Sequence, residues 1–325
     1  MKIIKTVKVF HILIIISFIV LVTNIDLLFS IPANQITDRN NYHIHVQDGK
    51  TWLAYVMSIG FPLFFFSEPV SKFIYFLLNI CFTSEQFSIK ILIFLQLYLT
   101  FYIVRRNSVL PFYWIIVIFL TPPVLVNYIM TLRQGLASMF FLFFFFSTDY
   151  RKFLWLSICP LIHFLFYGVL SIFFLSKLES IKSKPVFSLF LFFLFSLFFS
   201  FFSNKIIIYF NLSYFEVDSN EFKLRFGFQI VYWFLILVLF INEGNSFLRN
   251  NLFVSFIIAF YLASVFIVPQ LSRILDSLSI LIFLTGFQLT GKNLFFYKSL
   301  VLLFAFYQLF MFITNASLGS MMLNE

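Results

Sequence analysis

The chain has 325 residues, of which 62% are hydrophobic and only 11% are charged, and 55 of them are phenylalanine. A soluble protein of this length could not solvate such a surface, and repeated apolar runs are typical of membrane-spanning helices. The net charge of +9 lies largely in short connecting loops, as the positive-inside rule expects, and gives no indication of nucleic acid binding. We therefore predict an all-α, polytopic membrane protein without a soluble domain.

The first fifty residues are predicted to form one membrane span and one outer loop. Three lysines precede the apolar run 9–22, and no clear A-x-A cleavage pattern follows Ser30. We therefore interpret 9–22 as an uncleaved first span, with its N-terminus in the cytoplasm, rather than as a signal peptide. On this assignment the polar stretch 31–50 is a loop on the outer side of the membrane.

Two short apolar runs and one longer span come next. Residues 52–66 suffice only for a thin span or an interfacial helix. Glu68-Pro69 separates them from a second run that ends near residue 82. Residues 89–104 then form a span that ends at Arg105-Arg106, a pair typical of a cytoplasmic loop.

The run 111–130 leads outward again. We expect a kink at Pro122-Pro123 because proline lacks a backbone N–H donor. The next helix therefore begins on the outer side, near Arg133. Its phenylalanine-rich body returns to the basic turn Arg151-Lys152, which we place in the cytoplasm.

Residues 153–176 are compatible with one long span or with two short segments that meet near Pro160 and His163. The loop that follows, 177–184, carries three lysines and one glutamate, which indicates a cytoplasmic position. Only two segments leave both basic loops on the cytoplasmic side. We therefore predict two segments, with His163 at an outer turn.

The rest of the chain is predicted to contain five further spans, approximately 185–203, 226–242, 252–268, 274–290 and 294–314. A second outer loop, 204–224, is followed by Arg225. A later outer turn ends at Ser272, which can cap the next helix and place Arg273 in its first turn. The prediction is about ten to thirteen membrane-embedded helices in a single domain that covers residues 1–325.

Arg133 opens the phenylalanine-rich helix at a position that requires explanation. A charged side chain at membrane depth is costly and usually faces a polar cavity. Thr131 and Gln134 have the spacing of a capping box, which predicts that the helix starts at Thr131. Arg133 would then lie in the first turn, where the helix dipole is already positive, so a bound anion would stabilise it. The alternative is an arginine that merely reaches the membrane interface.

The predicted topology places Asp38, Arg133, His163 and Arg273 at the same outer face. Two arginines at helix starts suit a large anion such as pyrophosphate. An imidazole is a suitable general base because its ordinary pKa lies near neutral pH. Each residue also has a simpler explanation, which is packing for His163, a salt bridge with Asp276 for Arg273, and a solvated loop for Asp38.

No metal or cofactor site is predicted. His43 and His45 lie near Asp48, but no further ligand set accompanies them. The sequence has no glycine-rich phosphate loop and no serine triad pattern. Cys81 and Cys159 both lie within apolar runs, which favours packing over a disulfide.

Taken in order, these residues resemble the EpsG family of Wzy-like polysaccharide polymerases over most of the chain. The weaker matches are an Asp-x-x-x-Tyr pattern at Asp38 and Tyr42, Glu68-Pro69, Arg151-Lys152, His163 and Arg273. The more specific Arg-Gln-x-Leu-Ala signature is met by Arg133, Gln134, Leu136 and Ala137. The sequence departs from the family around the histidine, where the family usually has Ser-Ala after it and this chain has Phe164-Leu165.

The resemblance implies a multi-pass glycosyltransferase of the bacterial cytoplasmic membrane that works on its outer face in O-antigen, capsule or exopolysaccharide assembly. It would join oligosaccharide repeat units carried on undecaprenyl pyrophosphate, without a cofactor. The lipid bilayer, and a flippase and chain-length regulator of the same pathway, are the other expected partners. The candidate catalytic residues are His163, Arg133 and Arg273, with Asp38 or Glu68 as alternative bases. The candidate substrate-binding residues are Asp38, Tyr42, Glu68, Gln134 and Arg225.

Other functions use similar residues. An O-antigen ligase would pass the glycan to a different acceptor. A flippase or exporter of lipid-linked saccharide would need polar groups through the bilayer midplane, whereas the charged candidates here lie at one face. A purely structural protein would tolerate lysine in place of Arg133 and Arg273.

Overall fold

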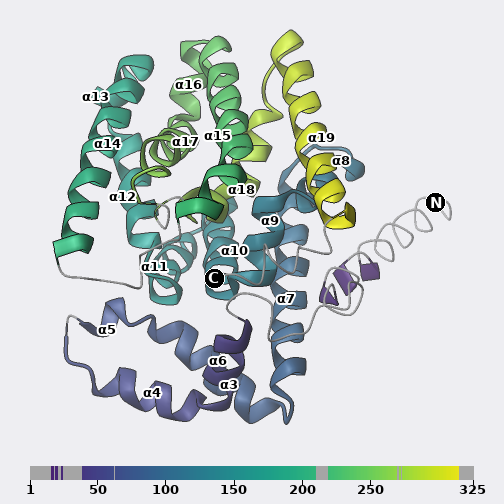
Figure 1. Ribbon diagram of the computed structural model, residues 1–325, viewed down its shortest axis with the longest axis vertical. Helices are drawn as coiled ribbons and strands as arrows, with labels where there is room; N and C mark the ends of the chain where they lie inside the picture. The colour runs from purple at the N-terminus through teal and green to yellow at the C-terminus, as the bar shows by residue number, and fades with distance from the viewer. Residues whose placement is uncertain are drawn as a thin grey trace. The chain divides into compact units, whose positions relative to one another are not determined.

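The computed structural model describes residues 16–17, 19–20, 23–24, 39–61, 63–209, 219–268, 271 and 273–314. It is about 84% helical, and no strand occurs in these ranges. The predicted all-α class is therefore confirmed for this part of the chain. Figure 1 shows the helices, which fall into two compact units that are described separately below.

The first unit carries Arg133 and His163. It comprises the chain up to residue 115, residues 125–164 and the positions from 308 onward. Helix α10 packs against α7, α11 and η2, and α6 packs against α3, α4 and α11. Its described helices are α3 (Arg39–Gln47), α4 (Gly49–Ser58), α5 (Leu63–Phe66), α6 (Pro69–Cys81), α7 (Glu85–Asn107), the π-helix η2 (Val126–Met130), α10 (Leu132–Phe146) and α11 (Lys152–Ile162).

The second unit comprises residues 116–124 and 165–307, so α8 (Phe112–Phe119) and α9 (Pro122–Leu125) each begin or end in it. Within it, α17 packs against α12, α14, α15 and α18. Its other helices are α12 (Phe166–Lys177), α13 (Glu179–Lys182), α14 (Pro185–Tyr209), α15 (Ser219–Asn242), α16 (Asn245–Asn250), α17 (Leu252–Ser264), α18 (Arg273–Gly286) and α19 (Gly291–Thr314).

Two described helices are long and apolar enough to cross a membrane, and they are Glu85–Asn107 and Pro185–Lys205. The number is three if the bent pair Phe112–Phe119 and Pro123–Ile129 forms a single span. Shorter apolar helices of 10–17 residues accompany them, namely Pro69–Cys81, Leu132–Phe146, Lys152–Ile162, Phe166–Lys177, Phe228–Asn242 and Leu252–Ser264. The described chain therefore contains the apolar helices that a membrane protein requires.

Helix α14 shows how the phenylalanine-rich sequence is used. Leu189, Phe192, Ser196 and Ser200 form a buried stripe at helical spacing, and the Phe192 ring stacks on Phe256 of α17 with centroids 4.2 Å apart. The exposed side of the helix is largely aromatic, with Phe187, Phe190, Phe195, Phe198, Phe201 and Phe202 each more than half exposed. An apolar face of this extent is stable against lipid hydrocarbon and not against water.

The start of α10 is fixed by close packing against η2. A Cβ atom on Gly135 would lie 2.5 Å from the Asn127 carbonyl oxygen, so only glycine lets the two backbones approach this closely. The fully buried Asn127 amide donates a hydrogen bond to the Ser138 hydroxyl at 3.1 Å. Gln96 of α7 donates to the Tyr128 carbonyl. These contacts hold the first turn of α10, which carries Arg133.

Two predicted breaks are confirmed. Helix α11 ends at Ile162 and α12 begins at Phe166, so residues 153–176 form two helices that part at His163. Helix α8 ends at Phe119 and α9 begins at Pro122, as the proline pair requires.

The predicted polar loops are shorter in the structure than in the sequence interpretation. Residues 39–47, expected as part of the loop 31–50, form α3, in which Tyr42 and Val46 lie one turn apart and are buried. Around the predicted loop 204–224, α14 continues to Tyr209 and α15 begins at Ser219. In both places polar sequence that was expected to be loop is partly helical.

Candidate functional site

Glu68 is the centre of the site. It precedes α6 as its N-cap residue, with Pro69 at the first helical position, and its backbone is left-handed (φ 57°, ψ 55°). It is the one non-glycine residue with positive φ among the described residues. This conformation costs a residue with a side chain roughly 1–2 kcal/mol, so strong contacts must hold it in place.

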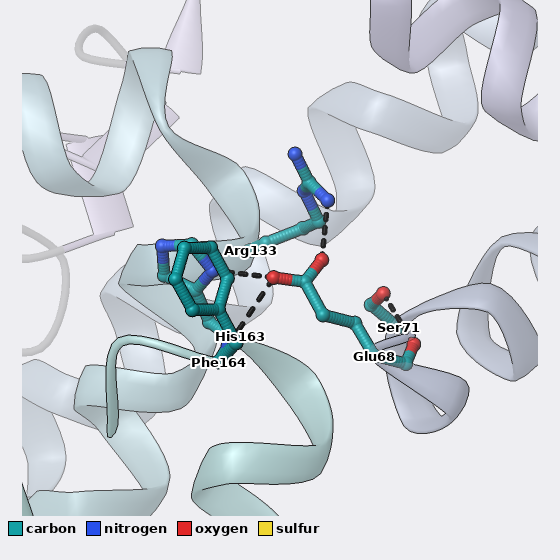
Figure 2. A network of polar contacts seen from close by, with 5 residues as sticks. All are labelled: Glu68, Ser71, Arg133, His163 and Phe164. Carbon is teal, nitrogen blue, oxygen red and sulfur yellow. Dashed lines mark hydrogen bonds and ion pairs between the residues drawn. The ribbon is translucent and has the colours of Figure 1, made fainter. Parts of the chain in front are cut away.

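Those contacts are made by the carboxylate of Glu68 (Figure 2). One oxygen pairs with the guanidinium of Arg133. The other lies 2.6 Å from His163 Nδ1 and accepts the Phe164 backbone N–H at 3.2 Å. The Glu68 side chain is only 6% exposed. A single buried carboxylate therefore joins the start of α10, the end of α11 and the start of α6.

The surroundings of Glu68 decide its protonation state. Burial alone would raise its pKa, but the hydrogen bond from His163, the charge of Arg133 and the Phe164 N–H lower the pKa to about 2. The side chain is consequently a carboxylate at any physiological pH. It compensates the charge of Arg133 and accepts hydrogen bonds, and it has no proton to give.

His163 lies at the C-terminal end of α11 in extended conformation (φ −146°, ψ 119°). Its ring is 12% exposed and meets Phe164 edge-on at 5.3 Å. A carboxylate only accepts hydrogen bonds, so an imidazole that carries its single hydrogen on Nδ1 donates it to Glu68. The lone pair then resides on Nε2, which makes His163 a proton acceptor whose orientation Glu68 fixes.

Arg133 keeps hydrogen-bonding capacity beyond Glu68. Its side chain is 29% exposed, and Tyr42 of α3 also hydrogen-bonds to it. The Nε–H is buried and has no partner in the described part of the chain. A guanidinium presents five N–H donors, so Arg133 can hold Glu68 and still bind an anion through its exposed edge.

The capping box predicted at Thr131 and Gln134 is wrong, although the helix start is right. Thr131 is the N-cap residue of α10, but its hydroxyl makes no capping bond. It points back to the carbonyls of Val126 and Asn127, at 3.4 and 3.3 Å, because the preceding residues already form the π-helix η2. The anion expected beside Arg133 is, within the protein itself, the carboxylate of Glu68.

A second group of side chains lies next to these residues, and of its members the sequence interpretation considered only His45, as a metal ligand. His45 stacks on Tyr75 and meets Trp52 edge-on, with ring centroids 5.9 and 5.0 Å away. Burial, followed by the charges of Lys72 and Arg133, lowers the pKa of His45 to about 4, so it is neutral. Lys72 is 7% exposed and lies over the Trp52 ring. The signal for Lys72 was available, because it is a lone charge inside the apolar run 69–81.

The remaining predicted residues are placed as follows. Gln134 is 2% exposed and faces the interior of the first unit. Arg273 is exposed and is the first residue of α18 in the second unit, so it does open a helix. Arg225 lies in α15, but its side chain lies outside the described part, and Asp38 lies outside it altogether. The structure thus brings together Glu68, Arg133, His163 and Tyr42.

Comparison with known proteins adds no relative. No family model matches the chain, and no curated protein or solved structure matches it significantly.

Proposed function

We propose that this protein is a polysaccharide polymerase of the bacterial cytoplasmic membrane, which joins oligosaccharide repeat units carried on undecaprenyl pyrophosphate. The observation that carries the proposal is that Arg133 and His163 meet on the buried carboxylate of Glu68. These residues come from three separate matches to the EpsG pattern. Packing alone does not require a strained glutamate, an arginine and a histidine to converge in so apolar a chain.

The proposed topology is polytopic, with about ten to thirteen membrane-embedded helices and the site at the outer face. The described residues contain two long apolar helices, one bent pair and six shorter apolar helices, which give eight or nine candidates. The proposed number adds segments that are predicted from the sequence alone. Helix α10 begins next to Arg133 and leads to the basic turn at Arg151-Lys152. The positive-inside rule places that turn in the cytoplasm and therefore Arg133 outside.

The proposed reaction transfers the growing glycan from one carrier lipid to the next repeat unit. An acceptor hydroxyl oxygen forms a bond to the anomeric carbon, and the bond from that carbon to the pyrophosphate oxygen breaks. His163 Nε2 takes the hydroxyl proton, and Glu68 stabilises the imidazolium that forms. Arg133 stabilises the negative charge that develops on undecaprenyl pyrophosphate as it leaves.

The other candidate residues receive supporting roles in the proposal. Arg273, at the start of α18 in the second unit, is a proposed anion-binding residue. Asp38, Tyr42, Gln134 and Arg225 contact the saccharide or its carrier. Glu68 positions Arg133 and His163, because its two carboxylate oxygens bind these two side chains and the Phe164 N–H.

Reconstitution of the full chain with lipid-linked repeat units distinguishes the possible functions. The proposal predicts a ladder of longer glycans that remain attached to the carrier lipid, with undecaprenyl pyrophosphate released once for each bond. Transfer of a single glycan to another acceptor lipid would indicate a ligase. Movement of unaltered repeat units across the vesicle membrane, without new bonds, would indicate a flippase and refute the proposal.

A further inference from the structure

Lys72 is a buried cation that the proposed mechanism does not use. It lies in α6 one helical turn after Glu68, and it is 7% exposed. Its amine lies 4.8 Å from the centroid of the Trp52 ring. Within the described part of the chain, no carboxylate or carbonyl oxygen accepts a hydrogen bond from it.

The neighbouring carboxylate is already occupied. Glu68 and Arg133 are the charged groups that act on Lys72 electrostatically, with opposite signs. Both oxygens of Glu68 are engaged, by Arg133, His163 and the Phe164 N–H. The region thus holds two basic side chains, Arg133 and Lys72, and one carboxylate. His45, which lies against Tyr75 and Trp52, is neutral and removes none of the excess positive charge.

The contact with Trp52 is too weak to explain the buried amine. A cation–π contact contributes about 0.5–2 kcal/mol, whereas the effective penalty for burying an ammonium group is several kcal/mol. A phosphate oxygen would supply both the missing charge and the missing hydrogen-bond acceptors. The balance of these terms therefore favours an anionic ligand at Lys72.

We propose that Lys72 and Arg133 together form a phosphate-binding subsite, with Trp52 as the platform that holds the lysine. Under the proposed function, on which this assignment rests, the ligand is the diphosphate of the carrier lipid. The same chemistry would also accept the phosphate of an anionic membrane lipid. Lys72 is then a binding residue for the leaving group, next to the arginine that stabilises its charge.

The test is a titration of the purified full chain with inorganic pyrophosphate in nanodiscs of phosphatidylcholine, followed by calorimetry. We expect Lys72→Gln to weaken binding at least tenfold and Lys72→Arg to retain most of it. Lys50→Gln, which changes an exposed lysine on α4, is the matched control and should bind like the wild type. Equal binding by the wild type and Lys72→Gln would overturn the subsite.

A second variant separates ligand binding from packing. Lys72→Met keeps a flexible, unbranched side chain of similar size and removes the unpaired charge, so the ligand-free protein should melt at a higher temperature than the wild type. If Lys72 served only to pack on Trp52, the same variant would melt at a lower temperature, which would contradict the subsite.

Two further measurements identify the source of the phosphate and distinguish failure of the subsite from failure of the proposed polymerase activity. Pyrophosphate binding that weakens in phosphatidylglycerol nanodiscs identifies a lipid headgroup as a competing ligand, and unchanged binding identifies the substrate diphosphate. Lys72-dependent binding without any glycan ladder would refute the polymerase and leave the subsite standing. A ladder made equally well by wild type and Lys72→Gln would refute the subsite alone.

Discussion

Glu68 performs two tasks with one carboxylate, since it compensates Arg133 and fixes the orientation of His163. Glu68 is the residue before α6, and its strained left-handed backbone directs the side chain into the first unit. Glutamine has the same size, but it cannot accept strong hydrogen bonds at both terminal atoms. The consequences of this substitution are therefore specific to the charge.

We expect Glu68→Gln to lower the free energy of unfolding by about 2 kcal/mol, because it leaves a partly buried guanidinium without its anion. Chemical denaturation in detergent measures this change. The matched control is Glu179→Gln, whose parent side chain is 87% exposed and pairs with Lys182. Exposed pairs contribute less than about 1 kcal/mol. Equal effects of the two variants would contradict the assigned role of Glu68.

The lowered pKa of Glu68 makes the stability of the folded protein depend on pH. The pKa of Glu68 falls from 4.5 to about 2 on folding, so between these values the unfolded chain binds more protons. The stabilisation from Glu68 is therefore complete above pH 4.5 and is lost as the pH falls towards 2. Melting temperatures measured from pH 5 to pH 2.5 should fall more steeply for the wild type than for Glu68→Gln. Parallel curves would exclude this ion pair as the cause.

Among single residues, the sequence indicated Arg133 and His163 as site residues, but it did not indicate which residue joins them. Arg133 was singled out because its charge conflicts with its surroundings, and His163 because of its position at a break. That Glu68 links them could not be deduced, since its contacts span 65 and 95 residues of sequence. Lys72 had the same signal as Arg133 and was overlooked.

At the scale of elements, the first turn of α10 depends on the backbone approach at Gly135. An added methyl group would meet the Asn127 carbonyl, which is main chain and cannot rotate away. We expect Gly135→Ala to destabilise the protein by about 1–3 kcal/mol and to reduce transfer activity, because it displaces Arg133. Thermal unfolding and product formation measure the two effects.

Gly168→Ala is the control for this prediction. Gly168 lies in α12, and its added methyl group would be 3.5 Å from Ile274 Cδ1, an ordinary contact. Alanine there should be neutral or stabilising by up to about 1 kcal/mol. A Gly135→Ala variant as stable and active as Gly168→Ala would show that the close approach has no consequence.

The helices themselves were predictable where proline or hydrophobic length set their ends. The break at Pro122 follows from the proline pair, whereas the break after Ile162 was predicted from the two basic loops that flank residues 153–176. Helix α3 was missed because its buried residues, Tyr42 and Val46, are few among polar ones. The capping box failed for a different reason, because the π-helix η2 supplies the Thr131 hydroxyl with nearer acceptors.

At the scale of the whole molecule, the exposed phenylalanines of α14 and the long apolar helices agree with the hydropathy of the sequence. Composition sufficed to predict these apolar helices, whose exposed surface is compatible with a lipid bilayer. The orientation rests on the basic loops, and it is tested by labelling from one side of the membrane.

Single-cysteine variants in a background of Cys81→Ser and Cys159→Ala provide that test. Phe164→Cys lies beside the site at a residue 45% exposed, and Tyr150→Cys lies at the basic turn at a residue 80% exposed. An impermeant maleimide added outside the cell should label position 164 and leave position 150 unmodified until the membrane is opened. The reverse pattern would place the site in the cytoplasm.

The most direct test of the central claim measures the rate at which the reconstituted protein joins two lipid-linked repeat units. We expect Arg133→Ala and His163→Ala each to reduce this rate at least a hundredfold, a loss typical of removing a charge-stabilising or general-base group. Arg249→Ala, at an exposed position on α16, should leave it unchanged. Wild-type rates in the well-folded Arg133→Ala and His163→Ala proteins would contradict the account.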